Sequence, residues 1–110
     1  MKEFIGHEWA AFKLGVAGII KVIVVDTNHF MGNFPDSISI EAVEDGVNES
    51  DTSLEPPKSW PIAILGSQKL GPNRHHYFVD QIIDHLKLSH VKVMIKPDGG
   101  ISRIRLLGIV

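Results

Sequence analysis

Two short segments of this chain concentrate the side chains that could bind or transform a small molecule. The first, Asp26-Thr27-Asn28-His29, presents a carboxylate, a hydroxyl, an amide and an imidazole at consecutive positions directly after an apolar run. The second ends in Arg103 and Arg105, whose spacing places both guanidinium groups on one face of a strand. If the two segments meet in space, they form a polar site on a β-sheet frame.

The arginine pair suits a small anionic ligand, because a planar guanidinium binds a carboxylate through two parallel hydrogen bonds. The alternative is a solvated, salt-bridged strand face, which is the commoner setting of an isolated Arg-x-Arg. Lys69, just before a Gly-Pro turn, is similar: it is usually a surface residue and sometimes an anion contact. Asp26 and Asn28 also have an alternative, since such residues at strand ends often only hydrogen-bond their own turn.

Histidines form a third group of candidates. His75 and His76 are adjacent, while His29, His85 and His90 are dispersed. A neutral imidazole can act as acid, base or ligand near pH 7. Adjacent residues of a strand point to opposite faces, so two neighbouring histidines cannot easily hold one metal ion. The HxH and HExxH spacings are absent, so no metal ligand is assigned and a requirement for a divalent metal stays open.

Composition narrows the function classes. A chain of 110 residues, 44% of them hydrophobic, fits one soluble domain, and the formal net charge of -2 argues against a dedicated nucleic-acid binder. The absence of cysteine excludes a disulfide framework and a thiolate zinc site. No apolar run reaches the length of a membrane span and the N-terminus does not resemble a signal peptide. We therefore expect a cytoplasmic protein with no membrane partner; the peroxisome is the alternative.

Strand-like runs separated by turn signals predict the all-β domain that positions these residues. Residues 19–26 are apolar on both faces, which is typical of a buried central strand. Residues 15–18 predict a turn before it, and the acidic segment 44–58 predicts a mobile surface loop. Residues 97–100 predict a hairpin that makes the last two strands antiparallel neighbours. We expect strands at 7–14, 19–26, 36–43, 60–67, 77–79, 90–96 and 101–109, and a short helical turn or loop at 80–88.

Four segments, taken in order, resemble the signature segments of the allantoicase family. Each is weak alone, but the ordered set covers nearly the whole chain and is specific. Met31 stands where the family usually has lysine. The segments are His7-Glu8-Trp9 through Lys13-Leu14-Gly15; Asp26 through Phe30 with Gly32 through Ser37; Trp60 with Lys69 through Asn73 and His76 through Phe78; and His90-Val91 with Pro97 through Arg105 and Gly108.

The resemblance implies a jelly-roll, galactose-binding-like antiparallel β-sandwich. Family members carry two tandem repeats, and this chain is more similar to the second. The GWETxR-type segment that precedes the first strand in the family is absent from this sequence. We therefore expect residues 1–110 to form a single, incomplete repeat that works with a companion repeat or as a homo-oligomer.

The resemblance also implies a hydrolase of purine catabolism that converts allantoate and water into ureidoglycolate and urea. Arg103 or Arg105 would hold the substrate carboxylate. Asp26, Asn28 or Asp98 would accept hydrogen bonds from the ureido groups, and His29 or a carboxylate such as Asp36 would move the protons. The candidates are His29, Asp36 and Asp26 for catalysis, and Asn28, Asn33, Lys69, Asp98, Arg103 and Arg105 for substrate binding.

Two other functions stay open at this point. One is a non-catalytic remnant of the enzyme that serves in assembly. The other is a binding module for sugars or similar small ligands, since jelly-roll domains often bind such molecules through loops at one end. Stabilisation by a sugar but not by allantoate would favour the binding module.

Overall fold

The computed structural model of the chain describes residues 3–4, 8–27, 37–46, 57–83, 85–96, 99–100 and 103–110, and all regular structure in these residues is β-strand. No helix capable of crossing a membrane occurs in these ranges. The strands are β1 (Glu3–Phe4), β2 (Glu8–Asp26), β3 (Ser37–Glu44), β4 (Ile62–Lys69), β5 (His75–Phe78), β6 (Leu88–Lys96), β7 (Gly99–Gly100) and β8 (Arg103–Ile109).

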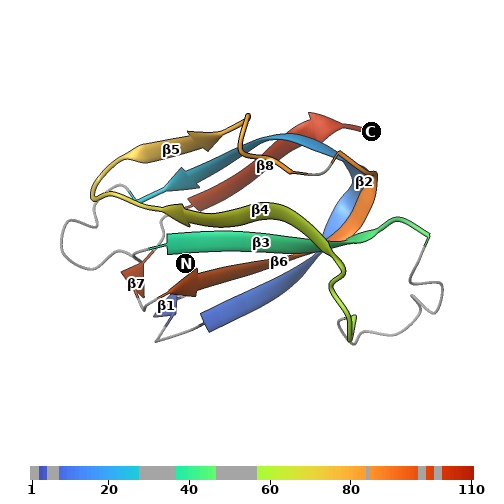
Figure 1. Ribbon diagram of the computed structural model, residues 1–110, viewed down its shortest axis with the longest axis horizontal. Helices are drawn as coiled ribbons and strands as arrows, with labels where there is room; N and C mark the ends of the chain where they lie inside the picture. Colours follow the sequence, from blue (N-terminus) through green and yellow to red (C-terminus); the bar gives the residue numbers. More distant parts are fainter. Residues whose placement is uncertain are drawn as a thin grey trace.

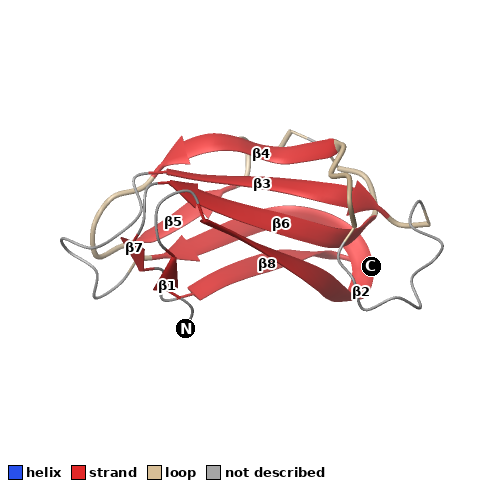
Figure 2. Ribbon diagram, turned by 90° about the horizontal axis from the view of Figure 1, so that it is seen from below, coloured by secondary structure: helices blue, strands red, loops and turns tan. Residues whose placement is uncertain are grey.

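The long strand β2 joins the two layers of a β-sandwich (Figure 1). Its first part pairs with β6, which gives one layer in the order β4-β3-β6-β2. Its second part, from Ile19 to Asp26, lies between β5 and β8 and forms the other layer. All these pairs are antiparallel, and the short strands β1 and β7 pair with each other at one end (Figure 2).

The turn predicted at residues 15–18 is wrong, because β2 runs through them without a break. Instead, the pairing of β2 with β6 loses its register between Lys13 and Gly18, and the strand bends there from one layer to the other. At Gly18 an added Cβ would lie 2.7 Å from the carbonyl oxygen of Ile109, so the missing side chain lets the bent strand approach the end of β8 closely. Residues 15–18 therefore mark the point where β2 passes from one layer to the other, and the chain does not reverse its direction there.

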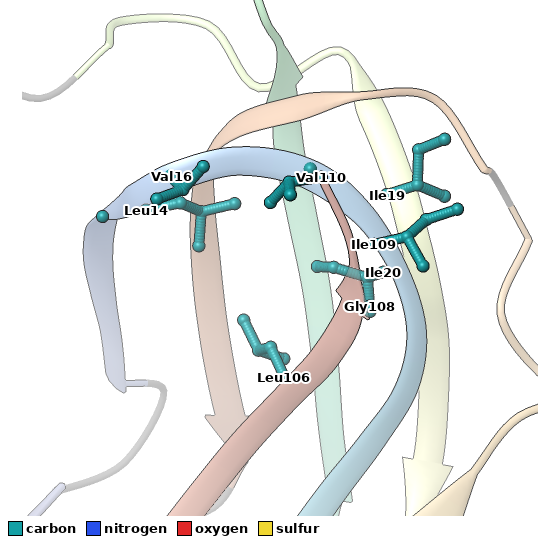
Figure 3. Close-up of a pocket in the computed structure, with 10 residues that line it drawn as sticks. Leu14, Val16, Ile19, Ile20, Leu106, Gly108, Ile109 and Val110 are labelled. Carbon is teal, nitrogen blue, oxygen red and sulfur yellow. The ribbon is translucent and has the colours of Figure 1, made fainter.

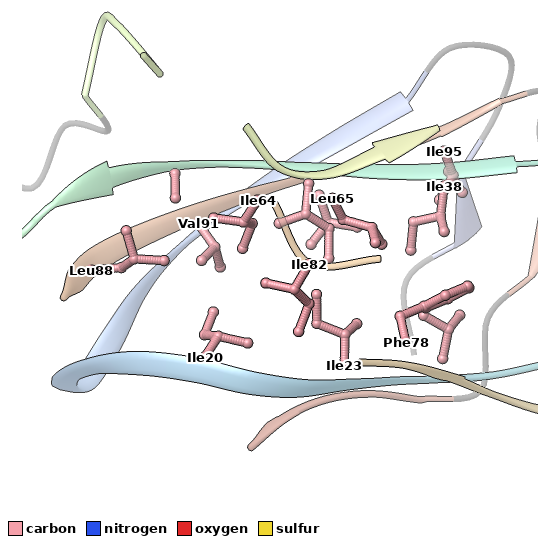
Figure 4. Packing of buried hydrophobic residues seen from close by; sticks show 14 of the residues in the cluster. Ile20, Ile23, Ile38, Ile64, Leu65, Phe78, Ile82, Leu88, Val91 and Ile95 are labelled. Carbon is pink, nitrogen blue, oxygen red and sulfur yellow. The ribbon is translucent and has the colours of Figure 1, made fainter. Parts of the chain in front are cut away.

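The core fills the space between the two layers (Figure 4). Strand alternation supplies most of it, because Ile38, Ile40 and Ala42 of β3 and Val91, Val93 and Ile95 of β6 point inward and are buried. Opposite them lie Ile23 and Val25 of β2, whose side chains are fully buried. Each such aliphatic side chain contributes roughly 1.5–3 kcal/mol on burial, so the core fixes the end of β2 that carries Asp26.

The predicted hairpin between the last two strands is also wrong, because β6 and β8 lie in different layers. Strand β6 is hydrogen-bonded to β2 on one side and to β3 on the other, so it has no free edge for β8. Strand β8 pairs with the second part of β2 instead. As a result, the arginines of β8 lie beside Asp26.

Two loop predictions have different outcomes. Residues 80–83 and 85–87 form no helix; they belong to a turn and loop in which Ile82 bridges to Leu65. Of the predicted mobile loop 44–58, Glu44 is the last residue of β3 and Gly46 has a positive φ of 88°. Residues 47–56 lie outside the described part of the chain, so the mobility of this loop stays a prediction.

Candidate functional site

Three strands bring charged and polar side chains together near the end of β2. Asp26 is paired in register with His75 of β5 on one side and with Arg103 of β8 on the other. One pleat earlier, Val24 lies between Tyr77 and Arg105. Residues paired across antiparallel strands point to the same face of the sheet, so these six side chains share the outer face. Asp26 of the first segment singled out for its chemistry therefore lies beside Arg103 and Arg105 of the second, a meeting that the sequence had left open.

A small pocket of about 70 Å³ lies among these side chains. Liquid water occupies about 30 Å³ per molecule, so the pocket holds about two waters, or a group the size of a carboxylate. It is lined by Val24, Asp26, His75, Tyr77, Arg103 and Arg105.

Asp26 and His75 form a close pair within the pocket. The imidazole Nε2 of His75 lies 3.0 Å from Oδ2 of Asp26, and the side chains are 52% and 15% exposed. The carboxylate is held on the central strand of its layer, whereas the imidazole lies on the edge strand β5 and is more open to solvent. Asp26 is therefore the fixed member of the pair and orients the imidazole.

The charge of the pocket suits a monoanion. Two guanidinium groups and one carboxylate sum to one positive charge when the imidazole is neutral. Within the described part of the chain, neither Arg103 nor Arg105 makes an ion pair or a side-chain hydrogen bond. Their donors are thus available to an oxyanion, which a guanidinium binds bidentately.

Thr27 anchors the loop that precedes β5. Its side chain is fully buried, and its hydroxyl donates a hydrogen bond to the Gly71 carbonyl at 2.7 Å and accepts one from the Arg74 N–H at 3.3 Å. The Arg74 carbonyl accepts from the Thr27 N–H at 2.9 Å and also lies 3.1 Å from the hydroxyl. This anchor fixes the start of β5 beside the end of β2, and with it the position of His75.

His76 completes the anchor from the opposite face of β5. Its Nδ1 lies 3.1 Å from the carbonyl oxygen of Val25, so this nitrogen carries the hydrogen and donates. Its Nε2 accepts a hydrogen bond from the Gly71 N–H at 2.8 Å. These two contacts fix one neutral tautomer. The two adjacent histidines thus serve different faces, as the strand alternation predicted.

The remaining candidates from the sequence lie elsewhere or outside the described residues. Lys69 is exposed at the end of β4, opposite Ser37, and does not line the pocket. No three His, Asp or Glu side chains in the described ranges come close enough to hold a metal ion. The positions outside the described residues are Asn28, His29, Asn33, Asp36 and Asp98.

Sequence reasoning missed His75 and Tyr77 as members of the site. The predicted strand began at residue 77, whereas β5 begins at His75. Had the strand been extended by two residues, alternation would have placed both side chains on one face. That this face of β5 lies beside Asp26 depends on the strand order, which cannot be read from a local sequence pattern.

A larger cavity of about 280 Å³ lies at the bend of β2, but its lining cannot carry out proton transfer (Figure 3). The described residues that surround it are glycine and aliphatic, among them Leu14, Val16 and Leu106. None of these described residues has a charged or titratable side chain. The small polar pocket is therefore the candidate functional site, despite its size.

Fold and site together define a jelly-roll, galactose-binding-like antiparallel β-sandwich with a small anion-compatible pocket on one outer face. Residues 2–110 match the family model described as "Allantoicase repeat". The chain belongs to the allantoicase family.

Relatives and solved structures agree with this assignment. The chain is 41% identical over 103 residues to a "Probable allantoicase" of Acinetobacter baumannii (strain AYE), covering 94% of this chain and 30% of the relative. It is 44% identical over 107 residues to a "Probable allantoicase" of Pseudomonas fluorescens (strain Pf-5), covering 96% of this chain and 31% of the relative. A solved "Structure of allantoicase" superposes with a TM-score of 0.74 at 35% identity, covering 96% of this chain and 28% of that one. The allantoicase of Saccharomyces cerevisiae gives 0.72 at 36% identity, covering 94% and 28%.

This chain spans less than a third of the length of these relatives. The resemblance stated from the sequence is confirmed, as is the sandwich fold.

Proposed function

We propose that this chain provides substrate-binding and catalytic groups for the hydrolysis of allantoate to ureidoglycolate and urea. In this reaction the bond between the methine carbon and one ureido nitrogen breaks, water supplies the new hydroxyl, and the leaving nitrogen gains a proton. The proposal depends on one observation: the pocket that joins Asp26, His75, Arg103 and Arg105 in a member of the allantoicase family.

The substrate fits the pocket in charge and in the size of its acidic end. Allantoate is a monoanion with one carboxylate and two ureido arms, and the pocket carries one net positive charge. We assign the carboxylate to Arg103 and Arg105, since a pocket of about 70 Å³ admits this group and leaves the arms outside. The proposed partners of the arms and of the leaving nitrogen are Asp26, Asn28, Asn33 and Asp98, with His29 and Asp36 as further candidates for proton transfer.

We also propose that the working assembly contains more than this one repeat. The chain covers 30% and 31% of the two bacterial relatives, so most of their length has no counterpart here. A companion repeat or a second copy of the chain would supply the rest of the substrate enclosure. Purification followed by mass measurement under native conditions would identify what accompanies the chain.

The direct test is release of urea from allantoate by the purified chain, alone and with a fragment of a relative that carries the other repeat. We expect urea in at least one of these two mixtures. Binding is measured separately by calorimetry with allantoate. Stabilisation by sugars with no response to allantoate in either assay would contradict the proposal and favour a sugar-binding module.

Substitution of the arginines tests the assignment of the carboxylate. Arg103→Gln and Arg105→Gln should each weaken allantoate binding about 10- to 100-fold, because each removes a charge-assisted hydrogen-bond donor worth roughly 1.5–3 kcal/mol. Arg74→Gln is the matched control, because Arg74 is exposed and its side chain does not line the pocket. Equal affinities in all three variants would remove the arginine pair from the binding site.

A further inference from the structure

The Asp26–His75 pair can transfer a proton, and the binding of a carboxylate by the arginines does not require this. The carboxylate accepts at 3.0 Å from Nε2 of the imidazole, which places the hydrogen of neutral His75 on Nε2. Nδ1 is then the nitrogen that gains or loses a proton. Within the described part of the chain, Nδ1 makes no hydrogen bond. The imidazole therefore has one anchored nitrogen and one free nitrogen.

The groups around His75 leave it as the proton carrier of the pocket. Arg103 and Arg105 face it from β8 and Asp26 from β2, while Tyr77 lies on its own strand with ring centroids 6.4 Å apart. Among these side-chain types, only histidine exchanges protons readily near neutral pH.

We infer that His75 is the proton-transferring residue of this pocket and that Asp26 is the residue that positions it. The inference rests on the function proposed above and names a catalytic residue for it. The sequence listed His75 among several histidines but gave it no role. It placed Asp26 with the catalytic candidates without pairing it with a histidine.

The proposed step balances in protons and electrons. Protonated His75 donates the hydrogen on Nδ1 to the ureido nitrogen of bound allantoate as the C–N bond breaks, and the bonding pair stays with the departing urea. The lone pair of the remaining ureido nitrogen forms a C=N bond to the methine carbon. Water then adds to this carbon, and His75 recovers a proton from the attacking water. The net change is one water consumed and one urea released.

Two variants and one control test the inference in the intact chain. In His75→Asn the kcat for urea release should fall by about 10²- to 10⁴-fold, a larger factor than the change in KM, because general acid–base catalysis typically contributes this much. Asp26→Asn should lower kcat and also allow both neutral tautomers of His75, which the ¹⁵N chemical shifts of the ring report. His85→Asn is the control, since His85 is exposed and lies outside the pocket. Circular dichroism verifies the fold of each variant.

Binding gives a second readout that needs no turnover. If a bound allantoate accepts a hydrogen bond from protonated His75, binding takes up one proton, so affinity should rise as pH falls, by up to about tenfold per pH unit. His75→Asn should abolish this slope, while Arg105→Gln should lower affinity at every pH and keep the slope.

The outcomes separate the two proposals. Urea release that survives in His75→Asn would overturn the role of His75 and leave the proposed function standing. A chain that binds allantoate with a slope that depends on His75 but never releases urea would refute the proposed function and with it the catalytic role of His75, and would leave His75 as a contact that takes up a proton on binding. An unchanged slope in His75→Asn, or a His75 ring that does not respond to allantoate, would overturn the inference in either case.

Discussion

At the scale of single residues, Thr27 connects the end of β2 to the loop before β5 more directly than any charged group does. Its buried hydroxyl is hydrogen-bonded to the backbone of Gly71 and Arg74. A buried backbone group that loses its partner costs roughly 1–3 kcal/mol, whereas the hydrogen bond itself contributes less. The stability of the pocket's wall therefore depends on a side chain that takes no part in binding.

Thr27→Val should lower the free energy of unfolding by roughly 1–3 kcal/mol, because valine keeps the shape and leaves the Gly71 carbonyl and the Arg74 N–H without their partner. Urea denaturation measures the change. Thr27→Ser is the matched control: it keeps the hydroxyl and loses one buried methyl, which costs about 0.8 kcal/mol. Hydrogen exchange should be faster at the Arg74 amide in the valine variant only. A serine variant less stable than the valine variant would show that the methyl group matters more than the hydroxyl.

At the scale of elements, the close approach of β2 and β8 depends on Gly108. A Cβ built at this position would overlap the carbonyl oxygen of Ile19 and lie 3.1 Å from the Cα of Ile20. All these neighbouring atoms belong to the backbone, so no side chain can move aside. The spacing at this point lets β8 run beside β2 as far as Ile109, and the same pairing places Arg103 and Arg105 in the pocket.

Gly108→Ala should therefore destabilise the protein by roughly 1–3 kcal/mol, the usual cost of forcing an extra methyl into a packed site. It should also weaken allantoate binding, because β8 carries both arginines. Gly15→Ala, in the same long strand β2, is the control: no atom lies within 4 Å of its added Cβ, so it should be neutral or slightly stabilising. Thermal unfolding of the two variants gives the comparison. Equal unfolding midpoints for the two variants would mean that β2 and β8 can move apart at Gly108 without a loss of stability.

The elements also show where local sequence patterns stop being informative. In β3, β6 and β8 the residues that face the core follow the alternation of the sequence, because burial requires a period of two in any half-buried strand. The turn at residues 15–18 and the terminal hairpin were predicted wrongly. Glycines at positions 15 and 18, and a proline with two glycines in residues 97–100, favour a change of direction locally, while the choice of partner strand depends on which edges are free. The sequence left open whether Asp26 and Arg103 meet. Their meeting, and the arrival of His75 beside Asp26, follow from the strand order.

At the scale of the whole molecule, an apolar surface surrounds the cavity at the bend of β2. Val16 is 68% exposed, Ile109 56% and Val110 89%, and all three line that cavity. Monomeric proteins seldom leave contiguous apolar patches of this kind uncovered. The relatives are more than three times as long as this chain, so a covering partner is available in a longer protein or in a second copy.

We expect the isolated chain to self-associate through this surface, and the double substitution Val16→Lys/Ile109→Lys to shift it toward a monomer of 12.2 kDa. Two added charges on each copy would be brought together in the associated state, and like charges in contact oppose association. Ile83→Lys is the control, since Ile83 is 64% exposed but lies outside the cavity. Sedimentation velocity at several concentrations gives the mass of each variant, with circular dichroism to verify folding. If the parent chain is a monomer at every concentration, or if Ile83→Lys has the same effect as the double substitution, the patch does not mediate self-association.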